Sequence, residues 1–230
     1  MHRGEARTAI YNRLMPRHSA SSVVAALATL VAISGCGKDS SVATRPIVLI
    51  FHPGAFKYGS AALMTAEEDA ARQRGFEPVS VEYRGHRQVG LPYSKRLSRR
   101  YARQGRVVVA FGESAGGSLA GVLAKRGLVE AAAVYDPPTD LMHQRWSSFL
   151  PDPLRKRLSL DGGPTASPIL AIASLNDQVV GWRDTVRWAH SDPAVKLATE
   201  RGGHLDPADI ADALRRSMRY LGRQVPTTGT

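Results

Sequence analysis

One segment constrains the fold of this chain more than any other. An apolar, β-branched run ends in a serine framed by glycines and passes directly into small residues, in Val107-Val-Val-Ala-Phe-Gly-Glu-Ser-Ala-Gly-Gly117. The run has the composition of a buried strand, and the residues after Ser114 have a helical pattern. A serine at so sharp a corner has a strained backbone, so its neighbours two positions away must lack bulky side chains, as Gly112 and Gly116 do. The segment therefore predicts a strand, a tight turn at Ser114 and a helix.

The spacing Gly112-Glu-Ser-Ala-Gly116 is that of a nucleophile elbow. A helix that begins at such a turn directs its free amides and its dipole toward an oxyanion formed beside the serine. A serine nucleophile also needs a base and an orienting acid, which in open α/β sheets lie in loops beyond the carboxyl ends of strands. We therefore expect Ser114 to be a nucleophile whose partners follow other strands of the same sheet.

The composition is that of an ordinary globular protein with one domain. The chain has 230 residues, of which 43% are hydrophobic and 22% are charged. Its formal net charge of +11 favours anionic partners. There is no nucleic-acid motif and no basic stretch interleaved with aromatic residues, so nucleic-acid binding is not expected.

Residues 1–35 are predicted to be a lipoprotein-type signal peptide. A basic stretch precedes the apolar run Ser22–Ile33, which has the length of a signal-peptide core rather than of a membrane span. Ile33-Ser-Gly-Cys36 resembles the lipobox of bacterial lipoproteins, in which the cysteine becomes a lipid-modified N-terminus. The resemblance implies a protein of the bacterial cell envelope, held at a membrane by Cys36 through a tether at 36–45. The alternative is a retained anchor helix with an unmodified Cys36. With a single cysteine, an intramolecular disulfide is impossible.

Strand-like and helical patterns alternate through the rest of the chain. The expected strands are Ile47–His52, Pro78–Tyr83, Arg106–Phe111, Ala131–Tyr135, Pro168–Ala173 and Val195–Thr199. The expected helices are Ser60–Arg74, Tyr93–Gln104, Ser114–Lys125, Gly181–His190 and Asp206–Leu221. Continuous apolar strands indicate a parallel sheet buried on both faces. We predict a doubly wound α/β domain over 46–223, with a mostly parallel sheet of about six strands, helices on both faces, and a tail at 224–230.

The base and the acid have clear candidates after the last two predicted strands. Asp177 follows the strand that begins at Pro168, and His204 follows Val195–Thr199. The chain order Ser, Asp, His is the one expected of this kind of sheet. Asp136, at the end of the preceding strand, is a rival for the role of the acid.

The oxyanion hole is expected to use the amide of Ala115, next after the nucleophile. Its second donor should come from the loop after the first strand, in His52-Pro-Gly-Ala-Phe56. Pro53 has no N–H, which leaves the amides of Gly54 and Ala55 as the candidate donors.

Together these motifs resemble the α/β-hydrolase superfamily, in its esterase/lipase branch with an HGGG-type oxyanion loop. The landmarks lie in order at His52-Pro-Gly-Ala-Phe, Val81-Glu-Tyr-Arg84, Gly112-Glu-Ser-Ala-Gly116, Asn176-Asp177 and Gly203-His204. Pro53 and Ala55 stand where the usual loop has glycines. The resemblance implies an eight-stranded sheet, of which two N-terminal edge strands have no counterpart in the pattern. It also implies acyl transfer without a metal or an organic cofactor.

Two further segments each allow two interpretations. Residues 139–165 lie where the family inserts caps, and Met142, Trp146 and Phe149 recur there at helical spacing before Pro151 and Pro153 end the pattern. These side chains form either part of the core or a small lid over an acyl pocket. Five basic residues between Lys95 and Arg103 share one face of a helix, which is either a solvated face or a contact for anionic lipid.

The sequence thus predicts a serine hydrolase that cleaves ester or thioester bonds of small to medium acyl substrates through an acyl-enzyme. The two alternatives are a peptidase or amidase on the same fold, and a non-catalytic envelope binding protein on a hydrolase scaffold.

Overall fold

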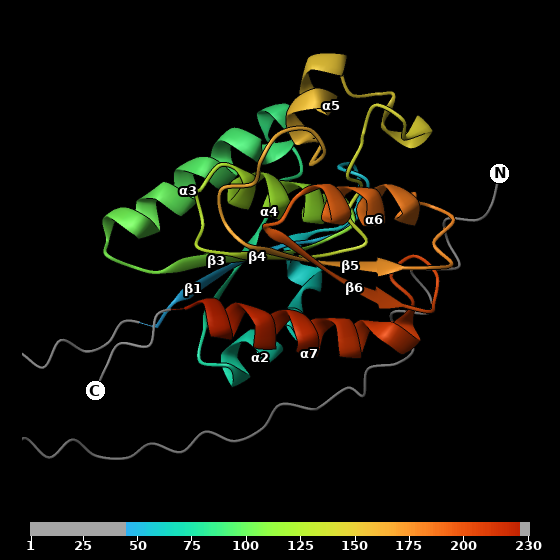
Figure 1. The fold of residues 1–230 in the computed structure, drawn as a ribbon. Coiled ribbons are helices and arrows are strands. Elements are labelled where there is room, and N and C mark those ends of the chain that lie inside the picture. The colour runs from blue at the N-terminus through green and yellow to red at the C-terminus, as the bar shows by residue number, and fades with distance from the viewer. Residues whose placement is uncertain (1–44, 226–230) are drawn as a thin grey trace, which may run out of the picture. The chain divides into compact units, whose positions relative to one another are not determined.

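The computed structural model describes residues 45–225, and these residues form a layered α/β domain around one sheet (Figure 1). Residues 1–44 and 226–230 lie outside the described part, and with them the predicted signal peptide, the lipidation site Cys36 and most of the tether. No helix within residues 45–225 has both the length and the apolar character needed to cross a membrane.

The described residues form a six-stranded sheet in which every neighbouring pair is parallel, so the predicted fold class is confirmed. Its strands are β1 (Ile47–Phe51), β2 (Glu77–Val81), β3 (Val108–Glu113), β4 (Ala132–Tyr135), β5 (Ile169–Ser174) and β6 (Val195–Glu200). Their order across the sheet is β2-β1-β3-β4-β5-β6. The direction of winding therefore reverses between β1 and β3. Crevices at such a reversal, beyond the carboxyl ends of the strands, are where sheets of this kind bind ligands.

The central strands are apolar throughout because helices cover both faces of the sheet. Every residue of β1 and of β3 is buried, whereas the edge strands β2 and β6 are partly exposed. Side chains of β1 alternate between two cores: Ile47, Leu49 and Phe51 face one, and Val48 and Ile50 face the other. The period of two places a complete hydrophobic layer on each side of the sheet.

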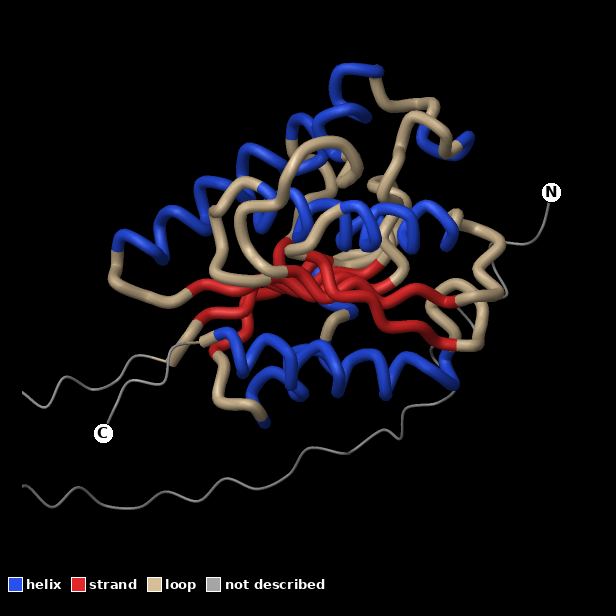
Figure 2. The backbone as a smooth tube through the Cα atoms, viewed as in Figure 1, coloured by secondary structure: helices blue, strands red, loops and turns tan. Residues whose placement is uncertain are grey.

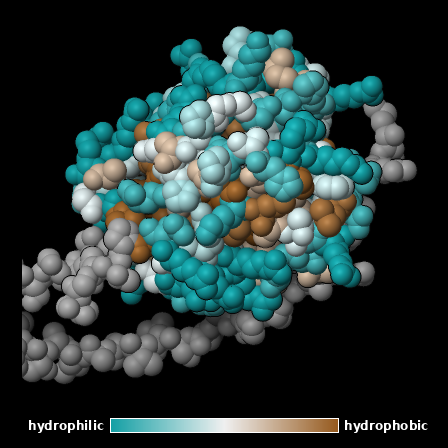
Figure 3. Space-filling view, viewed as in Figure 1, coloured by the Kyte–Doolittle hydropathy of each residue, from teal (hydrophilic) through white to brown (hydrophobic). Residues whose placement is uncertain are grey.

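The helices form two layers, as Figures 1 and 2 show. One layer holds α3 (Leu91–Arg103), α4 (Ala115–Lys125) and α6 (Trp182–Ser191). The other holds α2 (Thr65–Gln73) and α7 (Pro207–Gln224). In the face seen in Figure 3, hydrophilic residues cover the helices, and hydrophobic residues come to the surface at the level of the sheet.

The region of the predicted cap differs from the expectation. The pattern from Met142 was expected to end at Pro151 and Pro153, but the structure has only the short 3-10 turn η3 (Arg145–Ser147) there and begins a new helix, α5 (Asp152–Leu158). A proline is tolerated in the first turn of a helix because the amides of that turn have no intrahelical partner. Pro153 occupies such a position in α5, so it helps to start a helix rather than to end one.

Candidate active site

Ser114 lies at the corner between β3 and α4, at the reversal point of the sheet. It is buried, its φ is 49° and its ψ is −122°. A positive φ is costly for a residue with a side chain, and it persists only where the surroundings hold it. Here the amide of Ser114 donates to the carbonyl of Tyr135 on β4 (2.8 Å), and α4 begins at the next residue.

The two glycines of the motif are explained by close backbone contacts. A methyl group on Gly112 would overlap the carbonyl of Gly116, and one on Gly116 would overlap the carbonyl oxygens of Phe51 and His52. The start of α4 therefore lies directly against the end of β1. This packing places the loop after β1 beside the turn that carries Ser114.

His204 links Ser114 to Asp177 through a chain of hydrogen bonds. Its Nε2 lies 2.9 Å from Oγ of Ser114, and its Nδ1 lies 2.6 Å from Oδ2 of Asp177. The other carboxylate oxygen of Asp177 accepts the amides of Val179 (2.7 Å) and Val180 (2.9 Å). A carboxylate can only accept from Nδ1, so the imidazole presents Nε2 to the serine hydroxyl as an acceptor. The structure thus brings together three residues that the sequence placed in three separate loops.

Asp136, the rival acid, approaches the same histidine without bonding to it. Its Oδ2 lies 3.9 Å from Nδ1 of His204, and this oxygen accepts the amide of Leu205 (2.9 Å) and the hydroxyl of Ser174 (2.9 Å). Its Oδ1 accepts the amide of Ser174 (2.7 Å). Burial raises the pKa of the Asp136 carboxyl, and these hydrogen bonds oppose that rise. Asp136 therefore ties the end of β5 to the segment that follows His204.

The candidate oxyanion donors lie in two neighbouring segments, the start of α4 and the loop after β1. Ala115 is the first residue of α4, and within the described residues its amide has no acceptor. The amides of Gly54 and Ala55, in the loop after β1, likewise donate to no backbone group of the described chain. This loop turns through three consecutive residues with positive φ: Gly54 (129°), Ala55 (51°) and Phe56 (63°). A side chain at Gly54 would overlap the carbonyl of Tyr58, so this position requires glycine.

Comparisons with known proteins agree with this architecture. No protein-family model and no curated protein matches the chain. Solved structures do resemble it. An esterase from the planctomycete Thermogutta terrifontis with butyrate bound is 18% identical, with a TM-score of 0.65 over 80% of this chain and 86% of that one. EstE1, a carboxylesterase cloned from a metagenomic library, is 18% identical, with a TM-score of 0.64 over 79% of this chain and 81% of that one.

A third structure, described as a hydrolase of the alpha/beta superfamily from Xanthomonas campestris pv. campestris, is 20% identical, with a TM-score of 0.60 over 78% of this chain and 99% of that one. The chain has the α/β-hydrolase fold. At these identities the likeness is one of fold alone.

A buried histidine packs beside the candidate oxyanion loop, and the sequence pattern gave it no role. The ring of His52 stacks on Tyr83 (centroids 4.1 Å apart) and its Nδ1 donates to the carbonyl of Pro53 (2.8 Å). Nε2 lies 3.3 Å from Oε1 of Glu82. Burial alone would raise the pKa of Glu82, but amides of Ala61 and Arg84 donate to it and the net pKa is lowered. The sequence alone could not have assigned a role to His52, because the role depends on which side chains surround the loop.

The residues expected to line a substrate pocket have separate environments in the hydrolase fold. Trp146 is half-buried, and its ring lies 6.3 Å from the ring of Phe56 in the loop after β1. Met142 is half-buried as well. Phe149 is 39% exposed, with the ammonium group of Lys57 3.7 Å above its ring. Trp146 and Phe149 thus each contact the loop after β1, through Phe56 and Lys57 respectively.

Two buried carboxyl groups lie close to the elbow. Glu113 precedes the serine, and its pKa is well above its ordinary value because of burial and, secondarily, the charges of Glu67 and Asp136. Burial raises the pKa of Glu67 in the same way. Oε1 of Glu113 and Oε2 of Glu67 have no hydrogen-bond partner within residues 45–225. Both carboxyl groups therefore hold their protons more tightly than an exposed glutamate does.

Asp136, Asp177 and His204 offer three ligand atoms within 4.8 Å of one another, which is the spacing of a metal site. The carboxylate oxygens nearest the histidine are already engaged, however. Oδ2 of Asp177 pairs with Nδ1 of His204, and Oδ2 of Asp136 accepts two hydrogen bonds. The donor set therefore fits an oriented imidazole better than a cation.

Proposed function

We propose that this protein is a serine hydrolase that cleaves carboxylic ester or thioester bonds of small to medium acyl substrates. The observation that carries the proposal is the unbroken chain of hydrogen bonds from Ser114 through His204 to Asp177, at 2.9 and 2.6 Å. Serine, histidine and carboxylate in this geometry form the arrangement that activates a hydroxyl for acyl transfer.

In the proposed mechanism, Nε2 of His204 takes the proton of Ser114 as Oγ attacks the acyl carbonyl carbon. The imidazolium is stabilised by Asp177 and then gives its proton to the departing alcohol or thiol, which leaves an ester between the acyl group and Ser114. A water molecule, deprotonated by the same histidine, attacks that ester. The proton returns to Oγ when the carboxylic acid leaves.

The tetrahedral intermediates carry a negative oxygen, which needs preorganised donors. We assign the amide of Ala115 as one donor and the amide of Gly54 or Ala55 as the other. The proposal is supported by the lack of other acceptors for these amides in the described chain. His52, stacked on Tyr83, is assigned the role of holding the loop in place.

We propose acyl chains of about eight carbons or fewer, because the segment that could close over the site is short and a shallow pocket buries little of a longer chain. The Thermogutta terrifontis esterase with the same fold has been solved with butyrate and with propionate bound. We place the acyl group beside Trp146, which lies near the oxyanion loop.

A fluorophosphonate probe followed by a chain-length series of esters tests the proposal. The Thermogutta terrifontis esterase has been solved phosphonylated by sarin, which is chemistry of the same type. Labelling of Ser114 in the wild type but not in Ser114→Ala, with turnover highest on short esters, would support it. Absence of labelling would favour a non-catalytic binding protein, and faster turnover of matched amides would favour a peptidase or amidase.

We further propose that Cys36 carries a lipid anchor in a bacterial cell envelope, on the evidence of the lipobox-like segment. Cys36→Ser should release the protein from the membrane fraction or block its processing, without loss of hydrolysis. An unmodified Cys36 in the mass spectrum of the mature protein would refute this part of the proposal.

A further inference from the structure

The outer face of α3 concentrates positive charge. This helix contains five basic residues and no acidic ones: Lys95, Arg96, Arg99, Arg100 and Arg103. Four of the five are exposed and Lys95 is half-buried. No salt bridge joins any of them to a carboxylate in the part of the chain that the structure describes. In this respect α3 differs from α2 and α7, where arginines pair with acids three or four residues away.

Basic residues from two other elements join this face. Arg126, which follows α4, Arg157 of α5 and Arg99 all lie near enough to Lys95 to lower its pKa, an effect secondary to burial. Neither Arg126 nor Arg157 has a carboxylate partner among residues 45–225. Grouping like charges without counter-charges is unfavourable by itself. A stable cluster of this kind gains free energy when an anion binds to it.

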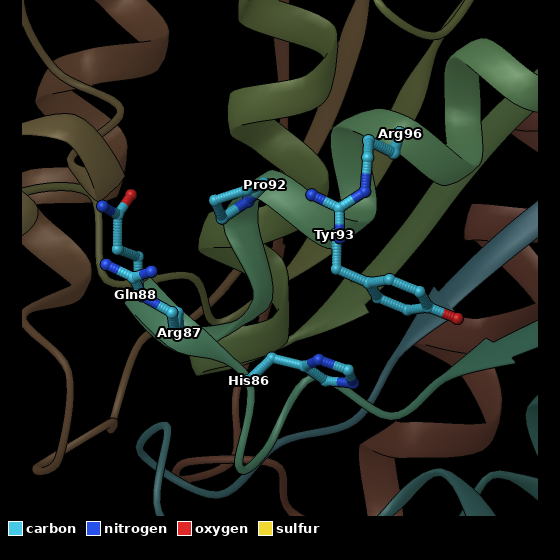
Figure 4. A pocket seen from close by; sticks show the side chains of 6 residues that line it. All are labelled: His86, Arg87, Gln88, Pro92, Tyr93 and Arg96. Carbon is cyan, nitrogen blue, oxygen red and sulfur yellow. The ribbon is translucent and has the colours of Figure 1, made fainter.

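A cavity of about 450 Å³ opens beside the cluster, between α3 and the preceding 3-10 segment η2 (Arg87–Gly90) (Figure 4). It is lined by His86, Arg87, Gln88, Pro92, Tyr93 and Arg96. Figure 4 shows Tyr93 and Arg96 projecting from α3, and His86, Arg87 and Gln88 from the segment before it. Nη1 of Arg157 donates to Oε1 of Gln88 (3.0 Å), so the cavity and the basic cluster are continuous.

The cavity is bordered by a strained backbone segment and by a pair of stacked rings. Gln88, Val89 and Gly90 are consecutive residues with φ of 52°, 46° and 74°. Two of the three carry side chains, and backbone strain of this kind persists at binding segments that their surroundings hold. The ring of His86 stacks on that of Tyr93, with centroids 4.6 Å apart and an interplanar angle of 2°. The backbone of η2 and the stacked rings of His86 and Tyr93 thus have a defined geometry at the edge of the cavity.

We propose that this cavity binds a phosphate group, with Arg87 and Arg96 as its principal ligands. Guanidinium groups present planar pairs of N–H donors that match phosphate oxygens, and an anion of more than one charge suits a site surrounded by several cations. Lys95 and Arg157 add positive charge at the rim, and the stacked pair of His86 and Tyr93 offers a flat surface to the rest of the ligand. None of the six lining residues belongs to the proposed catalytic set, so the site does not depend on the proposed hydrolysis.

The phosphate could belong to a soluble metabolite or to the headgroup of an anionic lipid. The soluble arm of the test measures binding of inorganic phosphate and of glycerol 3-phosphate to the full chain by calorimetry. The lipid arm compares flotation with phosphatidylcholine vesicles that contain or lack phosphatidylglycerol. The N-terminal segment is present in both vesicle experiments and is itself basic, so the difference between the two lipids reports the charge of the whole chain, and the variants below assign it to the cavity.

The decisive variant is the double substitution Arg87→Gln and Arg96→Gln, and the matched control is Arg219→Gln and Arg223→Gln on α7. All four residues are exposed, both pairs remove two charges, and α7 lies on the opposite side of the sheet from α3. Unchanged melting temperature and ester hydrolysis will establish that each variant is folded.

Loss of charge-assisted hydrogen bonds should weaken binding in the cavity variant by about tenfold or more, and the control should bind like the wild type. Selective loss of soluble phosphate identifies a metabolite site, and selective loss of the phosphatidylglycerol effect identifies a headgroup site. The proposal is overturned if the wild type binds neither probe, or if the α7 pair weakens binding as much as the cavity pair.

Discussion

Oδ2 of Asp136 lies 3.9 Å from Nδ1 of His204, which is within range of an electrostatic interaction but too far for a hydrogen bond. The same carboxylate accepts the amide of the next residue, Leu205, and two groups of Ser174. Asp177 holds the imidazole directly, at 2.6 Å. The two acids are therefore expected to have different roles: one orients the base, and the other fixes the loop that carries it.

This division predicts different defects for the two asparagine variants. Asp177→Asn should lower kcat by about 10⁴-fold with little loss of stability, because the imidazole would take the wrong tautomer. Asp136→Asn should cost about 1–3 kcal/mol of stability, since an amide group cannot accept all the hydrogen bonds of a carboxylate, and should lower kcat less. Ester turnover and denaturant unfolding of both variants check this. A larger loss of turnover in Asp136→Asn would mean that Asp136 is the catalytic acid.

The proposed nucleophile and base should behave as a unit. Ser114→Ala and His204→Ala should each fold normally and each lower kcat by about 10⁶-fold, and the double variant should be little worse, because either loss disables the same step. Single-variant and double-variant kinetics on one short ester provide the measurement. Turnover near the wild-type level in Ser114→Ala would show that the nucleophile lies elsewhere.

The contact between the start of α4 and the end of β1 predicts a severe effect from one methyl group. Gly116→Ala should cost about 1–3 kcal/mol or more, because the added carbon overlaps the carbonyls of Phe51 and His52. Gly222→Ala is the control: this glycine lies within α7 with nothing near its missing Cβ, so the change should be neutral or stabilise by up to about 1 kcal/mol. Urea unfolding of both variants distinguishes the cost of steric overlap from the effect of alanine on helix stability.

The burial of Glu113 leads to a prediction of how the stability of the folded protein changes with pH. Burial raises its pKa in the folded state, so the folded protein holds the proton more tightly than the unfolded chain does. Its contribution to stability is complete below the unfolded pKa of about 4.5 and is lost as the pH rises toward the folded pKa.

Glu113→Gln cannot ionise, so its stability relative to the wild type should increase as the pH rises from about 4.5 toward neutrality. The exposed residue Glu130 supplies the control variant, Glu130→Gln, for which no such divergence is expected. Thermal unfolding across this pH range is the measurement. Parallel curves for the wild type and Glu113→Gln would contradict a raised pKa of Glu113 in the folded protein.

Substitution of Trp146 tests whether the segment at 139–165 affects substrate choice. If its ring borders the acyl group, Trp146→Ala should shift the preferred ester chain length while costing less than the roughly 3–5 kcal/mol of a fully buried tryptophan. The ratio of kcat/KM for short and medium esters is the readout. An unchanged ratio with a large loss of stability would assign Trp146 to the core.

The features that the sequence predicted well are those encoded in short segments. Continuous apolar runs indicated the parallel strands, and the glycines around Ser114 indicated a turn that the contacts of Gly112 and Gly116 explain. The sequence misjudged α5, because Pro153 reads as a stop signal unless one knows that it falls in a first turn. It also could not show that His52 stacks on Tyr83, since this contact joins distant segments. For the same reason it could not show that Arg126, after α4, and Arg157 of α5 lie near Lys95 of α3.

The hydrogen bond between Ser114 and His204 joins residues 90 positions apart, and the histidine follows β6, a strand with a neighbour on one side only. Edge elements open locally at a lower free energy than central strands do. Fraying of β6 would withdraw His204, the proposed base, from Ser114 while β1, β3 and β4 remain paired. Thermal inactivation should accordingly begin below the temperature at which the domain unfolds, and it should be reversible as long as the central strands survive.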